Sequence, residues 1–161
     1  MNLRSSRSYA ARKSAGFTAV EMMVVVLIIA ILAALGAPSM IDMIRTQRVK
    51  TASFDTYAGL VLARSEAIKR NTSVTLTPAL GGTDWSGGWT TTDSNGNVVA
   101  RQDPLTGVTL AGPASVTFNG LGRLSAAVVP FNLSAPNIPA TRYRSITLGM
   151  SGRPVSSEGP F

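Results

Sequence analysis

The chain has 161 residues and contains neither cysteine nor histidine, while 15 Lys and Arg stand against eight Asp and Glu. These absences exclude a disulfide framework, the usual zinc sites and the Ser-His and Cys-His catalytic pairs. A membrane-anchored hydrolase would have to pair carboxylates such as Asp84, Asp93 and Asp103, which fall in Gly-rich or polar turns. We therefore expect no metal, no cofactor and no enzymatic activity, and the length fits one domain plus an anchor.

Residues 1–16 form a basic leader that accounts for most of the excess positive charge. They hold four of the 15 basic residues and no acidic one, so the rest of the chain has 11 basic against eight acidic residues, a net charge of +3. That balance is too mild to indicate a nucleic-acid-binding surface by itself. Positive residues before an apolar segment stay on the cytoplasmic side of a membrane. We therefore expect the rest of the chain beyond the apolar segment to be periplasmic or extracellular.

Residues 17–37 form an apolar segment of 21 residues in which only Thr18 and Glu21 are clearly polar. As a helix, such a segment spans roughly 30 Å, the thickness of the hydrocarbon core of a bilayer. A carboxylate inside a membrane costs on the order of 3 kcal/mol, so Glu21 needs a partner and a function. The segment predicts a transmembrane helix with one functional acidic residue.

Two ordinary explanations account for this segment less well. A secretory signal peptide has an apolar core of about 7–15 residues and a small-residue cleavage site, whereas this run is longer and contains Glu21. A cut after Leu35-Gly36-Ala37 would leave Pro38 directly behind it, where its fixed φ disfavours the extended geometry that a peptidase needs. A plain membrane anchor stays open as an alternative, but it gives no reason for Glu21 or for Gly16 at the border.

The run Gly16-Phe17-Thr18-Ala19-Val20-Glu21 resembles the class III signal of type IV pilins and pseudopilins. The resemblance implies that a prepilin peptidase cleaves between Gly16 and Phe17 and methylates the new amine of Phe17. It also implies that Glu21 is used for assembly with other pilins. After cleavage, the amine of Phe17 precedes Glu21 by one helical turn, so the carboxylate can pair with the amine of its own chain or with that of a neighbour.

The helical pattern continues beyond the apolar segment to about residue 71. Pro38 lacks the N–H group that would bond the carbonyl of Ala34, so we expect a kink there. Asn71 is a suitable residue for the end of the helix. Apolar and small residues recur with the helical period and predict the face that packs on the rest of the domain: Phe54, Ala58, Val61, Ser65 and Ile68.

From residue 72 onward, short β-branched segments alternate with turn residues, which favours antiparallel sheets. Asn95-Gly96 is a strong hairpin signal. We expect strands at 73–77, 88–92, 98–101, 108–110, 115–118, 128–133 and 143–148. The predicted fold is α+β, with a long N-terminal transmembrane and amphipathic helix packed on an antiparallel two-sheet β domain. The expected organisation is a cleaved leader (1–16), a transmembrane and assembly helix (17–37), an amphipathic continuation (38–71) and a periplasmic β-sandwich (72–161).

The blocks 45–49 and 62–71, together with Trp85 and Gly88-Trp89, resemble the GspH/FimT group of minor pilins and pseudopilins. That resemblance implies a structural subunit of a type IV pilus or of a type II secretion pseudopilus, anchored in the inner membrane. The implied partners are other pilins, the prepilin peptidase and inner-membrane lipid. The two tryptophans either stack on a ligand or close one end of the core, and we expect the core.

Some minor pilins of this group bind DNA during natural transformation through a Gly-Arg-x-Arg stretch near the C-terminus. Here the matching residues are Gly152-Arg153-Pro154-Val155, so the second arginine is absent. Arg142 and Arg144, with Arg123, form a basic strip around Arg153 only if the strands bring them together. DNA is thus a possible partner that we do not favour, and DNA uptake is the alternative function.

Overall fold

The computed structural model describes residues 16–159, without the side chains of residues 37 and 38. Its first element is a single long helix, α1, from Ala19 to Arg70. Contacts divide the chain into two compact units, Met1–Pro38 and Ser39–Phe161. The helix is continuous through Pro38, and the kink expected at that residue stays a prediction.

The first unit contains the apolar half of α1. Every described side chain from residue 16 to residue 36 is exposed. An 18-residue window of the helix has a mean hydropathy of 2.7 and none of it is buried by the rest of the chain. By length and composition this part of α1 is suited to cross a membrane.

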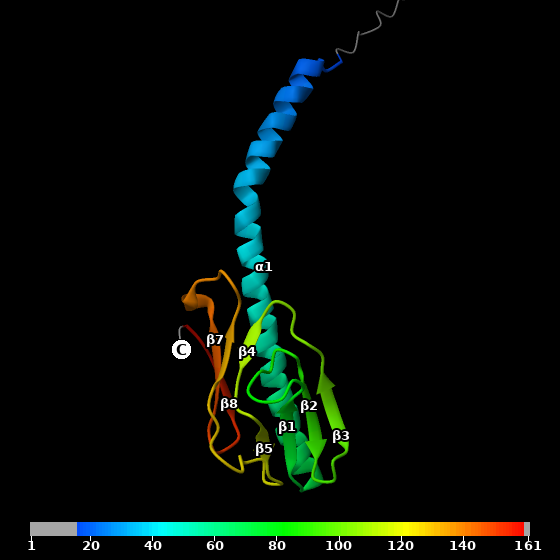
Figure 1. Ribbon diagram of the computed structural model, residues 1–161, viewed down its shortest axis with the longest axis vertical. Helices are drawn as coiled ribbons and strands as arrows, with labels where there is room; N and C mark the ends of the chain where they lie inside the picture. Colours follow the sequence, from blue (N-terminus) through cyan, green and yellow to red (C-terminus); the bar gives the residue numbers. More distant parts are fainter. Residues whose placement is uncertain (1–15, 160–161) are drawn as a thin grey trace, which may run out of the picture. The chain divides into compact units, whose positions relative to one another are not determined.

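The second unit combines the C-terminal half of α1 with two four-stranded antiparallel sheets (Figure 1). The first sheet has the order β3-β2-β1-β5, with β1 at Val74–Pro78, β2 at Trp89–Asp93, β3 at Val98–Gln102 and β5 at Val116–Phe118. The second has the order β4-β6-β7-β8, with β4 at Thr109–Ala111, β6 at Phe131–Ser134, β7 at Arg144–Leu148 and β8 at Pro154–Glu158. A short 3-10 helix, η1, covers Ala140–Arg142. The predicted fold class is confirmed.

The seven predicted strands are all present, and one further strand, β8, escaped prediction. β6 begins at Phe131, three residues later than expected. β8 begins with a proline and leaves its other four residues exposed, so it carries no apolar alternation. Proline is tolerated at the first position of a strand and on sheet edges. β8 forms because β7 pairs with it along its whole length: Leu148 lies opposite Pro154 and Arg144 lies opposite Glu158.

The end of α1 follows from Asn71, as predicted. Asn71 has a φ of 49°, the left-handed region that Asn tolerates better than most residues. Its N–H donates to the carbonyl of Ile68, and the N–H of Thr72 donates to the carbonyl of Ala67, both at 3.2 Å. This pair of bonds is a Schellman motif, which satisfies the last helical carbonyls and turns the chain into β1.

The face that α1 packs against the sheets differs from the predicted one. Phe54 is 71% exposed, Val61 42% and Ile68 49%. The residues that enter the core are mostly smaller, and they lie on another side of the helix: Val49, Ala52, Leu60, Ala63 and Ala67. The predicted packing face is therefore wrong.

Small side chains occupy the contact face of α1 because the helix lies very close to β2. A Cβ atom added at Gly59 would be 3.0 Å from the Trp89 ring. Larger residues on that face would push the helix away and open voids in the core, whose packing tolerates little mismatch. The helical period is present in both patterns, so period alone does not distinguish the two faces.

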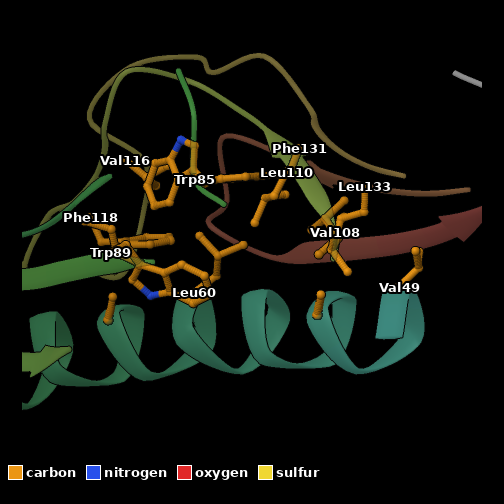
Figure 2. Packing of buried hydrophobic residues seen from close by; sticks show 14 of the residues in the cluster. Val49, Leu60, Trp85, Trp89, Val108, Leu110, Val116, Phe118, Phe131 and Leu133 are labelled. Carbon is orange, nitrogen blue, oxygen red and sulfur yellow. The ribbon is translucent and has the colours of Figure 1, made fainter. Parts of the chain in front are cut away.

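The two tryptophans lie in the core, as expected. Trp85 is 1% and Trp89 3% exposed, and Figure 2 shows both near Leu60 of α1. The Trp85 ring meets the edge of Phe131 at a centroid distance of 4.9 Å. Its indole N–H donates to the carbonyl of Pro113 at 2.7 Å, so its polar group is satisfied without a ligand.

Candidate assembly segment and basic residues

The first turn of α1 is organised by Thr18 and Glu21. The Oε2 atom of Glu21 accepts hydrogen bonds from the Thr18 N–H at 2.8 Å and from the Thr18 hydroxyl at 2.9 Å. In return, the N–H of Glu21 donates to the Thr18 hydroxyl oxygen at 3.2 Å. This reciprocal arrangement is a capping box, which satisfies N–H groups that a helix start leaves free.

The capping box leaves one oxygen of Glu21 available. Among residues 16–159, no hydrogen bond reaches its Oε1 atom. Sequence reasoning considered only amines as partners of Glu21 and missed Thr18, although the spacing Thr-x-x-Glu is a readable capping signal. The carboxylate thus holds its own helix start and still has a free acceptor for a second chain.

Gly16 and Phe17 lie just before this turn. Phe17 is 78% exposed. Among the described residues, a Cβ atom at Gly16 would meet nothing within 4 Å. No steric contact with residues 17–159 therefore requires a glycine at position 16.

The basic residues near the C-terminus are already engaged in part. Arg144 forms an ion pair with Glu158 at 3.0 Å, across the β7–β8 ladder. Arg142, in η1, donates from Nη1 to the Thr46 hydroxyl of α1 at 3.2 Å. Arg144 therefore links β7 to β8, and Arg142 links η1 to α1.

Arg153 lies at the opposite end of the β7–β8 hairpin. It precedes Pro154, which pairs with Leu148, whereas Arg144 pairs with Glu158 four positions away. At about 3.4 Å per residue, Arg153 and Arg144 are separated by roughly 15 Å along the strands. Among the basic residues considered from the sequence, the structure brings Arg123 toward Arg153 and leaves Arg142 and Arg144 at the other end.

Arg123 and Arg153 each follow a glycine in two loops that touch. A Cβ atom at Gly152 would collide with the carbonyl oxygen of Gly122. The same carbonyl accepts a hydrogen bond from Arg64 Nε of α1 at 2.9 Å. Within the described residues, no three acidic side chains are placed to hold a metal ion.

Two family models match the chain. The model for the type II transport protein GspH matches residues 55–152, which is more than half of the chain. The model for the prokaryotic N-terminal methylation motif matches residues 11–37, a range that contains Gly16, Phe17 and Glu21. No curated protein matches the chain.

The fold is similar to that of a solved minor pilin. Two crystal structures of the type IV minor pilin FimU from Pseudomonas aeruginosa strain PAO1, in space groups P65 and P21, match with TM-scores of 0.56 and 0.58. Their sequences are 21% and 19% identical to this one; the matches cover 67% and 71% of this chain and 91% and 96% of theirs. At this identity the likeness concerns the fold. With the two family matches it leads to one conclusion: the chain belongs to the GspH family of type IV pilin-like proteins, as a minor pilin or pseudopilin.

Proposed function

We propose that this protein is a structural subunit without catalytic activity that enters a type IV pilus or a type II secretion pseudopilus through α1. One observation carries the proposal. Residues 19–36 of α1 are all exposed, and all are apolar except Glu21. The Oε1 atom of Glu21 accepts no hydrogen bond within the described chain. Such a helix has too much unpartnered apolar surface to stand alone in water, and it needs lipid or other helices around it.

Processing comes first in this proposal. A prepilin peptidase cuts between Gly16 and Phe17 and methylates the new amine, while the helix is held in the inner membrane with the leader in the cytoplasm and Ser39–Phe161 in the periplasm. The match to the N-terminal methylation motif supports this step. The exposure of Gly16 and Phe17 also supports it, because a peptidase needs an accessible bond.

Pairing follows processing. The Oε2 atom of Glu21 stays with Thr18, and Oε1 accepts the amine of Phe17 from a neighbouring subunit. Either charge alone is costly in lipid, and the pair offsets that cost. Glu21 thereby sets the register between neighbouring subunits and the choice of partner, since a neighbour must present its amine at the depth of this carboxylate.

Processing is tested by intact-mass analysis of the membrane-extracted protein. We expect a chain that begins at methylated Phe17. Gly16→Leu should remain in the membrane as the full precursor, because a bulky residue blocks the cut without disturbing the local fold. An N-terminus at Met1 or Pro38 in the unaltered protein would rule this step out.

Assembly is tested with Glu21→Ala. The variant should insert and be processed normally, since losing a charge favours insertion, yet its amount in sheared fibres or captured with partner pilins should fall at least about tenfold, the effect of 1.4 kcal/mol. Glu66→Ala is the matched control, because Glu66 lies on the same helix and pairs with Lys69 and Arg70 of its own chain. Unchanged incorporation of Glu21→Ala would refute the role of this carboxylate.

DNA uptake is the less favoured alternative. Arg144 is neutralised by Glu158, and the strands separate it from Arg153 instead of bringing the two together. A phosphate-binding surface needs several unpaired cations within reach of one backbone. The arrangement supports the structural role in preference to a DNA receptor.

A further inference from the structure

A small cavity lies between α1 and the strands β2 and β3 of the first sheet. Its volume is about 310 Å³, near the lower end of the roughly 300–1,000 Å³ that is usual for small-molecule sites. The residues of its wall that bear on a ligand are Asp55, Gly59 and Leu62 of α1 and Trp89, Thr91 and Arg101 of the strands. All of them lie in Ser39–Phe161, so a ligand here is independent of the pairing of Glu21.

Two polar side chains in the cavity wall are buried and have no partner. Trp89 is 3% and Thr91 1% exposed. The indole N–H of Trp85 donates to the carbonyl of Pro113. In contrast, neither the indole N–H of Trp89 nor the hydroxyl of Thr91 makes a hydrogen bond within residues 16–159. Buried polar groups are normally hydrogen-bonded, so both groups need a partner that enters the cavity.

Gly59 leaves space in front of the Trp89 indole. A Cβ atom at position 59 would be 3.0 Å from both Nε1 and Cζ2 of Trp89. Figure 2 shows the ring nitrogen of Trp89 on the side that faces α1. Because glycine has no side chain to cover it, the N–H group of Trp89 borders the cavity.

The cavity has one acidic and one basic side chain on opposite walls. Asp55 belongs to α1 and Arg101 to β3. None of the five ion pairs among the described residues includes either of them. A charged ligand would be attracted by one wall and repelled by the other. The cavity therefore favours a neutral ligand that carries both hydrogen-bond donors and acceptors.

We propose that this cavity binds a neutral saccharide unit. A hydroxyl group both donates and accepts, so the hydroxyls of one sugar ring accept from the Trp89 N–H and from Arg101 and donate to Asp55. Leu62 is 43% exposed and offers apolar surface to the C–H groups of the ring. Several polar groups converge in a small volume. Neighbouring hydroxyls match that density, whereas a peptide amide has only one donor and one acceptor.

Nuclear magnetic resonance tests the site with an internal reference, because the chain has only two tryptophans. Full-length protein labelled with nitrogen-15, in a detergent without a sugar headgroup, is titrated with glucose, galactose, mannose and N-acetylglucosamine. We expect at least one of these sugars, at millimolar concentration, to shift the indole N–H resonance of Trp89. The Trp85 resonance should move far less, because its N–H stays bonded to Pro113. No shift with any of the four sugars, or an equal shift of both resonances, would overturn the proposal.

Thr91→Val separates a binding role from a structural one. The hydroxyl makes no hydrogen bond within the described chain, so its loss should leave the midpoint of urea unfolding unchanged or raise it. Affinity for the sugar should fall about fivefold, the effect of about 1 kcal/mol. Thr90→Val is the matched control, because Thr90 lies on the opposite face of β2 and should not affect binding. Unchanged affinity in Thr91→Val would contradict the site.

Charged derivatives of one ring test the selection for a neutral ligand. Glucosamine, a cation near neutral pH, and the anion glucuronate should both bind more weakly than the neutral sugar. Arg101→Gln should shift the preference toward glucosamine and Asp55→Asn toward glucuronate, because each removes one charge and keeps a planar polar group. A disaccharide of the bound sugar distinguishes a glycan chain, which gains affinity from its second ring, from a single sugar, which does not. Tighter binding of either charged sugar, or of diglycine, by the unaltered protein would refute a neutral saccharide as the ligand.

Discussion

Asp93 shows how one residue fastens a turn in this fold. Its Oδ1 atom accepts the N–H groups of Asn95 and Asn97 at 2.9 Å, and its Oδ2 atom accepts the Asn97 amide at 3.0 Å. These hydrogen bonds hold the pKa of Asp93 below its usual 3.8, and the bond from the Asn97 side chain has the largest effect. The charged form therefore stabilises the fold fully above pH 3.8, and this contribution is lost as the pH falls through the lower folded-state pKa.

Asp93→Ala tests this linkage. The variant should unfold at lower urea concentration than the unaltered protein at pH 7, and the difference should shrink once the pH drops below 3.8. Fluorescence of the buried Trp85 and Trp89 follows unfolding from pH 7 to pH 2. Asp103→Ala is the control, because Asp103 is exposed and accepts no hydrogen bond through its carboxylate within residues 16–159. A difference that is independent of pH would contradict the assignment.

The helix α1 carries two helical patterns in its C-terminal half. One is a run of small and medium residues that enters the core, and the other is a stripe of larger residues, including Phe54 and Val61, that stays exposed. Close approach to Trp89 at Gly59 selects the first pattern. Hydrophobicity counts for less here than volume, because a helix pressed on a sheet leaves little space on the contact face.

Two substitutions on α1 separate these faces. Leu60 is 1% exposed, so Leu60→Ala should lower the free energy of unfolding by about 2–5 kcal/mol. Phe54 is 71% exposed, so Phe54→Ala should change it by no more than about 0.5 kcal/mol. Urea denaturation of both variants gives the two values. An equal loss for Phe54→Ala would restore the packing face that the sequence predicted.

For the whole molecule, charge decides between a structural and a nucleic-acid-binding role. Residues 17–161 carry 11 basic and eight acidic side chains, a net charge of +3. Folding then distributes these cations, pairing Arg144 with Glu158 and placing Arg153 at the other end of the hairpin. Few phosphates can be neutralised at once, so the salt dependence of binding is the informative quantity.

We expect DNA binding by the processed, detergent-solubilised protein at low salt only. Fluorescence anisotropy over a salt series measures it. Affinity should fall below the micromolar range well before about 150 mM salt, and it should respond little to Arg153→Ala combined with Arg144→Ala. Micromolar binding at about 150 mM salt that the double variant abolishes would instead establish DNA uptake as the leading function.

Local patterns in the sequence determined much of this protein. The apolar run predicted the first half of the helix, and Asn71 predicted where the helix ends. β-branched alternation and the Asn95-Gly96 turn predicted strands that exist. These features are readable because each depends on residues that are neighbours along the chain, through helical period, cap chemistry or turn geometry.

The tertiary structure decided what depends on residues distant in sequence. The small-residue face of α1 is the buried one because the Trp89 ring packs directly against Gly59. The fold formed β8 because β7 supplies the pairing that β8's own residues do not signal. It also separated Arg144 from Arg153, since strand register sets which side chains meet. Volume, register and distance are properties of a packed arrangement, and no single stretch of sequence contains them.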